Sequence, residues 1–343
     1  MYGTVFGVLK VQRQEVLPVK LLFLRGQVPT DRPKEQIMFT DLASCDDVWT
    51  QLGRGLVGND YGEIWYWGGQ RTVRYDEHYT DRWLSSFDVT DHDFDVDVIF
   101  ARGGFQEYDK VLRRHPKAVK VYYGAGRRYL PPKGYFSDFD LVLVDHPFQL
   151  QEAQKRFNAR LFIKPASENV FKPRPGNRLY DVIMVSNYTK FKGVDLFLSK
   201  LPRSMRALVV GIMPPHLRQQ YPYVTFKGWL SRHNLPALYA QSTVSVCCAN
   251  FDVDSNPRVV VESIACDCPV VVLDTVRLWQ EKYITPQTGR VCGVKSLIQT
   301  IQDVGQHRSE YAPRRYYDEN LSMNVAVRQV TEAVRQCHAG RLG

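Results

Sequence analysis

The sequence predicts an α/β protein with two Rossmann-like domains. The chain has 343 residues, more than a single hydrophobic core usually serves, so two domains are expected. Its hydrophobic fraction of 44% and charged fraction of 24% are ordinary for a folded protein. In the second half, short β-branched runs alternate with helix-like segments, a pattern typical of βα units around a buried parallel sheet.

The regular elements of the second half can be placed from this alternation. Strands are expected at 181–185, 206–211, 224–227, 244–248 and 269–273, with helices at 194–200, 216–220, 235–241, 259–266 and 294–304. In the first half, strands are expected at 19–24, 96–100, 118–123, 140–144 and 160–163, whereas 44–83 shows no clear period. The Pro- and Gly-bearing stretch 164–178 is the expected linker.

Charge and cysteine content suggest a location and leave two kinds of partner open. The formal charge is +9, and nine basic residues against two acidic ones fall within 102–133. This stretch is either a solvated face or a contact with a polyanion or an anionic membrane. The seven cysteines form no CxxC pair, which favours free thiols. No apolar run of about 18 residues and no leader-like N-terminus is found, so we expect a cytoplasmic protein.

Two carboxylates eight residues apart carry the chemistry predicted for the second half. Asp254 precedes an expected helix and Glu262 lies about one turn inside it, as Glu262-Ser-Ile-Ala-Cys-Asp-Cys-Pro-Val-Val. Ligands of open α/β sheets bind where strand ends meet helix N-termini, whose N–H groups attract anions. The alternatives are a turn or helix-capping acid for Asp254 and a capping or surface carboxylate for Glu262.

This segment resembles the retaining glycosyltransferase family that carries a Glu-x7-Glu motif. The resemblance implies that Glu262 accepts hydrogen bonds from the nucleotide ribose and that Asp254, which stands where the family has Glu, contacts the donor sugar. The segment from Val185 to Gly193 is similar to the family's phosphate loop. There Lys192 matches a pyrophosphate-binding Lys, while Asn187 stands in place of an Arg.

Further pieces follow in the family's order. Gly228-Trp229 resembles a segment near the nucleotide base, and Lys190 is a candidate to replace the missing cation at Asn187. Arg258 either reaches the donor phosphates or stabilises its own loop. The resemblance covers roughly 160–320.

The resemblance implies the GT-B fold, two Rossmann-like domains facing across a cleft. The expected units are an acceptor-side domain at 1–168, a donor-binding domain at 169–322, and a C-terminal helix within 323–343 that crosses back to the first domain. The implied reaction is retaining transfer from a UDP-, GDP- or ADP-sugar to a hydroxyl, with Lys192, Glu262 and Asp254 as its central residues. No permanently bound cofactor and no metal are expected, since no Asp-x-Asp motif follows a predicted strand.

The acceptor side is defined by two loops in the basic stretch. Arg102-Gly103-Gly104 and Gly126-Arg127-Arg128 each follow an expected strand, and their glycines allow close approach to a ligand or simply make tight turns. Carbohydrate or lipid-linked acceptors are expected, and a hydroxymethylated DNA base is the competing acceptor, because cations next to tyrosines suit nucleic acid.

Two rival functions share this architecture. A non-catalytic protein of the same fold would bind nucleic acid or membrane without turning over a donor, and a sugar-nucleotide epimerase would need no acceptor.

Overall fold

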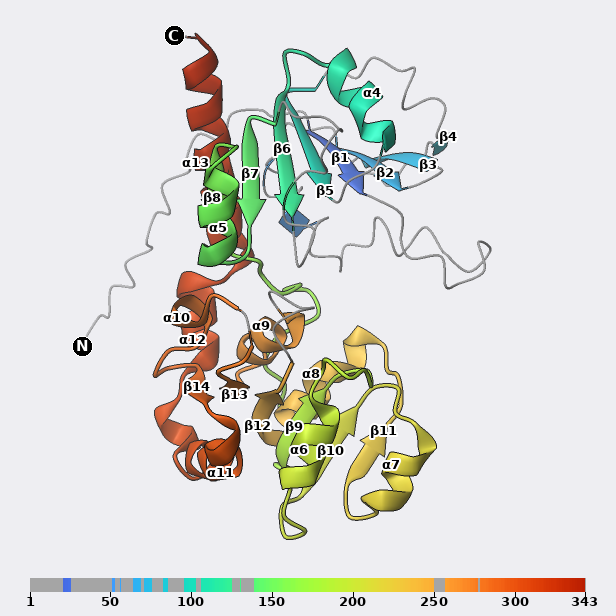
Figure 1. The fold of residues 1–343 in the computed structure, drawn as a ribbon, viewed down its shortest axis with the longest axis vertical. Helices are drawn as coiled ribbons and strands as arrows, with labels where there is room; N and C mark the ends of the chain where they lie inside the picture. Colours follow the sequence, from blue (N-terminus) through green and yellow to red (C-terminus); the bar gives the residue numbers. More distant parts are fainter. Residues whose placement is uncertain are drawn as a thin grey trace, which may run out of the picture.

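The fold is known from a computed structural model, which describes residues 21–25, 51–52, 56, 64–68, 71–75, 83–85, 96–102, 106–124, 130, 139–249, 257–276 and 278–342. Within these residues the chain forms two sheets with helices packed on them (Figure 1). The α/β class predicted from the alternating pattern is confirmed.

The second sheet is parallel throughout and has the strand order β11-β10-β9-β12-β13-β14. This order is that of the Rossmann fold, in which the first to third strands run outward from the centre in one direction and the fourth to sixth in the other. The chain therefore reverses its direction of winding between β9 and β12. The strands are β9 (Tyr180–Val185), β10 (Ala207–Val210), β11 (Thr225–Lys227), β12 (Ser242–Cys247), β13 (Val270–Leu273) and β14 (Gly289–Cys292).

Helices join these strands because each buried strand is followed by an amphipathic segment. All five strands and all five helices predicted for this half are present, while β14 and two later helices were not predicted. The helical elements are α6 (Val194–Lys200), α7 (Pro215–Gln220), η3 (Arg232–Asn234), α8 (Leu235–Ala240), α9 (Arg258–Ala265), α10 (Gln280–Tyr283), η4 (Val294–Ser296), α11 (Leu297–Gln306), η5 (Arg308–Glu310) and α12 (Pro313–Asn320).

The first sheet has the order β4-β3-β2-β1-β5-β6-β7-β8, parallel from β2 to β8 and antiparallel at β3 and β4. The five strands predicted here are present, but the three in the region without a clear period were missed. The elements are β1 (Leu21–Arg25), β2 (Ile64–Gly68), β3 (Arg71–Tyr75), β4 (Trp83–Ser85), β5 (Val98–Arg102), α4 (Gln106–Arg114), β6 (Val119–Gly124), β7 (Leu141–Val144), α5 (Pro147–Gln154) and β8 (Ala159–Leu161).

Helix α13 (Met323–Leu342) follows the second sheet in the sequence but packs on the first (Figure 1). Its buried residues Met323, Ala326, Val330 and Ala333 are spaced by three or four positions, which places them on one face of the helix. That face joins one hydrophobic cluster with alternate residues of the strands, such as Val119 and Val121. The intervening strand residues face the opposite side of the sheet.

Two segments connect the sheets, and hydrogen bonds tie them together. Glu168, just after the first sheet, accepts from the backbone N–H of Met323 at 2.7 Å and from Tyr317 Oη at 3.3 Å. Gln329 of α13 accepts from the N–H of Ile163 at 2.9 Å. The start of α13 is therefore fixed to the linker as well as to the first sheet.

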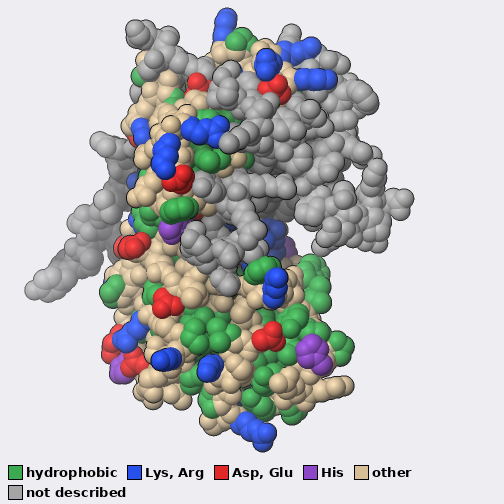
Figure 2. All heavy atoms as spheres, in the orientation of Figure 1, with side chains coloured by type: hydrophobic (Ala, Val, Ile, Leu, Met, Phe, Trp, Pro, Cys, Tyr) green, Lys and Arg blue, Asp and Glu red, His purple; other side chains and the backbone are tan. Residues whose placement is uncertain are grey.

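Charged side chains of both signs lie on the described part of the face drawn in Figure 2. Figure 2 shows hydrophobic side chains over the lower half, with separate Lys, Arg, Asp and Glu side chains among them. In the basic stretch 102–133, Lys120 is buried, and Arg113 pairs with Asp109 at 3.1 Å. Arg113, Arg114 and Lys117 lie shortly before β6 begins, at the opposite edge of the sheet from the strand ends where ligands of such folds bind.

Candidate active site

A pocket of about 500 Å³ opens at the carboxyl ends of β9, β10 and β12, where the strand order reverses. Ligands of doubly wound sheets bind at this position because the loops on either side diverge and leave a crevice. The volume falls in the range of ordinary small-molecule sites. Its lining residues are Met184, Val185, Ser186, Asn187, Lys192, Val210, Gly211, Trp229, Leu230, Arg232, Leu235, Val246, Cys247, Cys248, Ala249, Pro257, Arg258, Val259 and Glu262.

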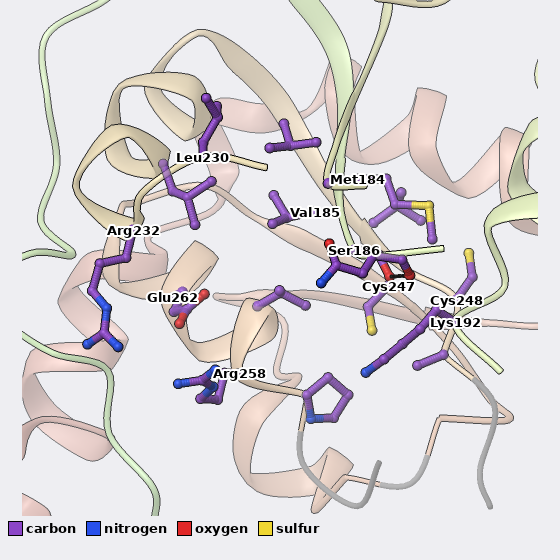
Figure 3. A pocket seen from close by; sticks show the side chains of 18 of the residues that line it. Met184, Val185, Ser186, Lys192, Leu230, Arg232, Cys247, Cys248, Arg258 and Glu262 are labelled. Carbon is purple, nitrogen blue, oxygen red and sulfur yellow. Dashed lines mark hydrogen bonds between the residues drawn. The ribbon is translucent and has the colours of Figure 1, made fainter. Parts of the chain in front are cut away.

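Lys192 reaches the pocket from the loop between β9 and α6 (Figure 3). The next residue, Gly193, has a left-handed backbone with φ of 67°, and a Cβ built there would lie 2.1 Å from the carbonyl oxygen of Cys248. Only glycine fits both conditions without strain. The Lys-Gly pair therefore lets the loop pass directly over the end of β12, which sets where Lys192 enters the pocket.

The loops after β9 and β10 are fitted together in a similar way. Gly211 has φ of 138°, and an added Cβ would meet the carbonyl oxygen of Ser186 at 2.1 Å. Asn187 Oδ1 accepts from the backbone N–H of Ile212 at 3.0 Å. Asn187 thus links the two loops while also lining the pocket, a structural task that the Arg found in the resembling family could not perform in the same way, since a guanidinium has no acceptor.

Glu262 enters the pocket from α9, whose first residue is Arg258. The two residues are four positions apart and therefore lie on the same face of the helix. The side chain of Glu262 is partly buried. Burial raises the pKa of Glu262, while the charges of Arg258, Arg232 and Lys164 partly offset that rise. Figure 3 shows Glu262 with Arg258 and Arg232 beside it.

The pocket has an excess of positive charge. Among the lining residues, Lys192, Arg232 and Arg258 are cationic, and Glu262 is the one carboxylate. The first turn of α9 adds the backbone N–H groups of Arg258 and Val259, and an eight-residue helix carries a positive dipole end there. This arrangement suits a ligand with two adjacent parts. One part is an anionic group that the cations and N–H groups hold, and the other donates hydrogen bonds to the carboxylate of Glu262.

The structure brings together five of the predicted site residues. Asn187, Lys192, Trp229, Arg258 and Glu262 all line the pocket.

Lys190 and Gly228 are not among the lining residues. Lys190 is exposed, and its ammonium lies 4.8 Å from the centre of the Phe191 ring. Gly228 lies next to Trp229, with nothing within 4 Å of an added Cβ.

The remaining predicted residues are described only in part or not at all. Arg102 is the last residue of β5, in register with Arg25 and Tyr123, and its side chain is outside the described atoms. The other predicted residues lie outside the described residues: Asp254, Gly103, Gly104, Arg127 and Arg128.

Arg232 and Lys164 are charged residues near the site that the sequence reasoning missed. Arg232 follows Trp229 by three positions, so the Gly-Trp segment was a signal for its neighbourhood. Lys164 opens the predicted linker and is 7% exposed, a burial that nothing in the sequence indicates. Its charge acts on Glu262 from the segment that joins the two sheets.

Among the described residues, no group of three or more His, Cys, Asp or Glu side chains is arranged to hold a metal ion. None of the described helices combines the length and the apolar character needed to cross a bilayer.

Comparison with known proteins identifies the fold. Residues 180–304, which include most of the pocket, match the family described as "Glycosyl transferases group 1". A search of curated proteins finds no match.

Several solved structures are similar over nearly the whole chain. Sucrose-phosphate synthase from Thermosynechococcus elongatus superposes with a TM-score of 0.64 at 14% identity, covering 94% of this chain and 100% of that one. AviGT4, a glycosyltransferase involved in avilamycin A biosynthesis, gives 0.66 at 13% identity, with coverage of 94% and 99%. Anabaena HepE in complex with UDP gives 0.59 at 15% identity, with coverage of 93% and 100%.

These similarities confirm the predicted GT-B fold. The activity is supported by the family match over 180–304, which is to a family of glycosyltransferases.

Proposed function

We propose that this protein is a retaining glycosyltransferase that moves a sugar from a nucleotide-sugar donor to a hydroxyl acceptor. The observation that carries the proposal is the pocket at the reversal of strand order, which Lys192, Arg232, Arg258 and the carboxylate of Glu262 line together with the start of α9. A nucleoside diphosphate has the matching chemistry, namely phosphate oxygens that accept and ribose hydroxyls that donate.

In the proposed reaction, the donor diphosphate lies against Lys192, Arg258 and the N–H groups of α9. Negative charge grows on the diphosphate as the sugar leaves, and fixed donors stabilise that charge most strongly in the transition state. Glu262 accepts hydrogen bonds from the ribose and so orients the donor. Asp254 is proposed to contact the sugar hydroxyls, in keeping with the Glu-x7-Glu resemblance.

A front-face transfer accounts for retention without a protein nucleophile. In such a transfer the acceptor hydroxyl approaches on the side that the diphosphate leaves, and the departing phosphate takes the proton. The chain then needs to supply only positioning and charge stabilisation, which are the properties of this pocket.

The domain division is part of the proposal. Residues 169–322 would bind the donor and residues 1–168 the acceptor, with the helix within 323–343 holding the two together. The acceptor would be a carbohydrate or a lipid-linked sugar, or a hydroxymethylated DNA base approached through Arg102, Arg127 and Arg128. A cytoplasmic location is expected from the sequence alone.

The test is a transfer assay with purified protein and radiolabelled UDP-, GDP- and ADP-sugars. Oligosaccharide, lipid and hydroxymethylated DNA acceptors are offered in parallel, and Glu262→Ala serves as the control. Label that enters one acceptor class, and is lost in the control, supports the proposal and identifies the acceptor.

Other outcomes favour the two rivals. Conversion of the nucleotide sugar without any acceptor would favour an epimerase. Tight DNA or vesicle binding with no turnover of any donor would favour a binding protein.

A further inference from the structure

The pocket has two chemically different ends. In Figure 3, Lys192 enters from one side and Arg232 from the other, with Glu262 between them in that view. Lys192 lies among small and polar groups such as Ser186, whereas Arg232 lies near Leu230 on the chain that follows β11. If the diphosphate lies at the Lys192 end and the ribose at Glu262, the end near Arg232 is left for the base.

Trp229 gives this end an aromatic surface. The side chain lines the pocket although it is 60% exposed. An indole ring at the pocket wall offers an aromatic face on which a flat ring can stack. Stacking on an aromatic side chain is available to every base, so Trp229 would add affinity without selecting among bases.

Arg232 has a side chain that can select among bases by hydrogen bonding. It is the first residue of η3, so its backbone is held by that turn and by the buried Leu235 that begins α8. A guanidinium carries five N–H donors and no acceptor. The guanidinium can therefore donate hydrogen bonds to a carbonyl oxygen on the edge of a base. It cannot bond to an exocyclic amino group in this way, because both groups are donors.

We propose that Arg232 selects donors with a keto base, uracil or guanine, by donating hydrogen bonds to the carbonyl oxygen at C4 of uracil or C6 of guanine. Cytosine and adenine carry an amino group at those positions. The proposal rests on the proposed function, because it assumes that a nucleotide occupies the pocket. It adds the class of base and assigns the selection to one residue.

The test measures the affinities of UDP, CDP, GDP and ADP by titration calorimetry. UDP with CDP and GDP with ADP are pairs of similar shape that differ in the carbonyl or amino group at the relevant position. We expect at least one keto member to bind roughly tenfold or more tighter than its amino partner. The pair that shows the preference distinguishes uracil from guanine as the natural base.

Three variants separate selection from general affinity. Arg232→Ala should bring the keto-to-amino ratio close to one. Arg232→Lys keeps the positive charge but lacks the planar guanidinium with its paired N–H donors. It should therefore keep overall nucleotide affinity within a few-fold of the wild type while losing most of the keto-to-amino affinity ratio. Trp229→Ala should weaken all four nucleotides by similar factors and leave the ratio unchanged. Both residues are exposed, so the variants should fold, and circular dichroism checks this.

Each result has a separate meaning. A ratio of one in the wild type, or a ratio that Arg232→Ala does not change, overturns the assignment of Arg232 while leaving the nucleotide-binding pocket intact. Failure of all four nucleotides to bind overturns the proposed function together with this inference.

Discussion

The two sheets carry different parts of the protein's chemistry. In the second sheet, one pocket gathers charged side chains from the segments after β9 and β11 and from α9. In the first sheet, the described strand residues are mainly core, and α13, which arrives from the far end of the chain, packs on one of its faces. Among the described residues, the pocket is therefore lined by the second half of the molecule, and α13 and the linker hold the first half to the second.

From this difference we expect that donor binding and sugar transfer can be separated experimentally. All lining residues of the pocket fall between 184 and 262. A change confined to the first sheet should affect transfer far more than donor binding, whereas a change in the pocket should affect both. The predictions below use this contrast, beginning with the largest effect.

A buried charge at the contact between α13 and the first sheet should give the largest effect. Ala326 is fully buried in the cluster that α13 shares with β1, β5, β6 and β7. Ala326→Asp should cost several kcal/mol of stability there, because an unpaired carboxylate cannot be buried cheaply. We expect transfer to be abolished while UDP or GDP binding persists, as measured by calorimetry.

The control for this change lies two residues further along the same helix. Arg328 is exposed, so Arg328→Asp puts the same carboxylate on the helix without entering the core, although it changes the net charge by −2 where Ala326→Asp changes it by −1. It should leave transfer nearly unchanged. Loss of nucleotide binding together with transfer in Ala326→Asp would contradict the separation of the two halves.

Removing the pocket lysine should have the next largest effect. Lys192→Ala should lower kcat about 100- to 1000-fold, the usual result of deleting one donor that stabilises developing charge. Lys190→Ala is the matched control two residues away, since Lys190 is exposed and does not line the pocket. Steady-state kinetics of both variants also test whether Lys190 takes the place of the Arg that Asn187 replaces. A comparable loss in Lys190→Ala would show that it does.

The same contrast explains how much could be predicted from the sequence. The second half consists of contiguous βα units, so each motif sits at a strand end and its place in the pocket follows from chain order. Lys192, Glu262 and Arg258 could be found in this way. The Gly228-Trp229 segment indicated the neighbourhood of Arg232, but the approach of its side chain to Glu262 depends on how the chain folds after β11, which the sequence pattern does not show.

The first half is harder to predict from the sequence because its sheet contains both parallel and antiparallel strands. Strands β2 to β4 pair outward from β1, with β3 antiparallel to both neighbours. Their aromatic residues, such as Trp65 and Trp67, gave no clear alternation, although two β-prone runs flanking Gly68-Gly69 were an available hairpin signal. The position of α13 was implied by the resemblance alone, since helical spacing does not say which sheet a helix covers.

The glycine after Lys192 should be required for stability. Gly193→Ala places a Cβ in the left-handed region and 2.1 Å from a backbone oxygen, so it should lower the free energy of unfolding by at least about 1–3 kcal/mol. Gly228→Ala is the control, because nothing lies within 4 Å of its added Cβ. Denaturant unfolding of both variants measures the difference. Equal stability would mean that the loop carrying Lys192 is not held against Cys248 as described.

The smallest effect is expected from pH. Burial raises the pKa of Glu262 above that of an ordinary glutamate. Protonation removes the acceptor for the ribose hydroxyls, so donor affinity should be full above the raised pKa and fall as the pH drops through it. Affinity should be measured with a nucleotide sugar as the ligand, because its phosphates do not change their protonation in this pH range. In Glu262→Gln the affinity should be lower and independent of pH over the same interval, since the amide cannot titrate. A persisting acid limb in that variant would assign the pH dependence to another group and remove the ribose contact from Glu262.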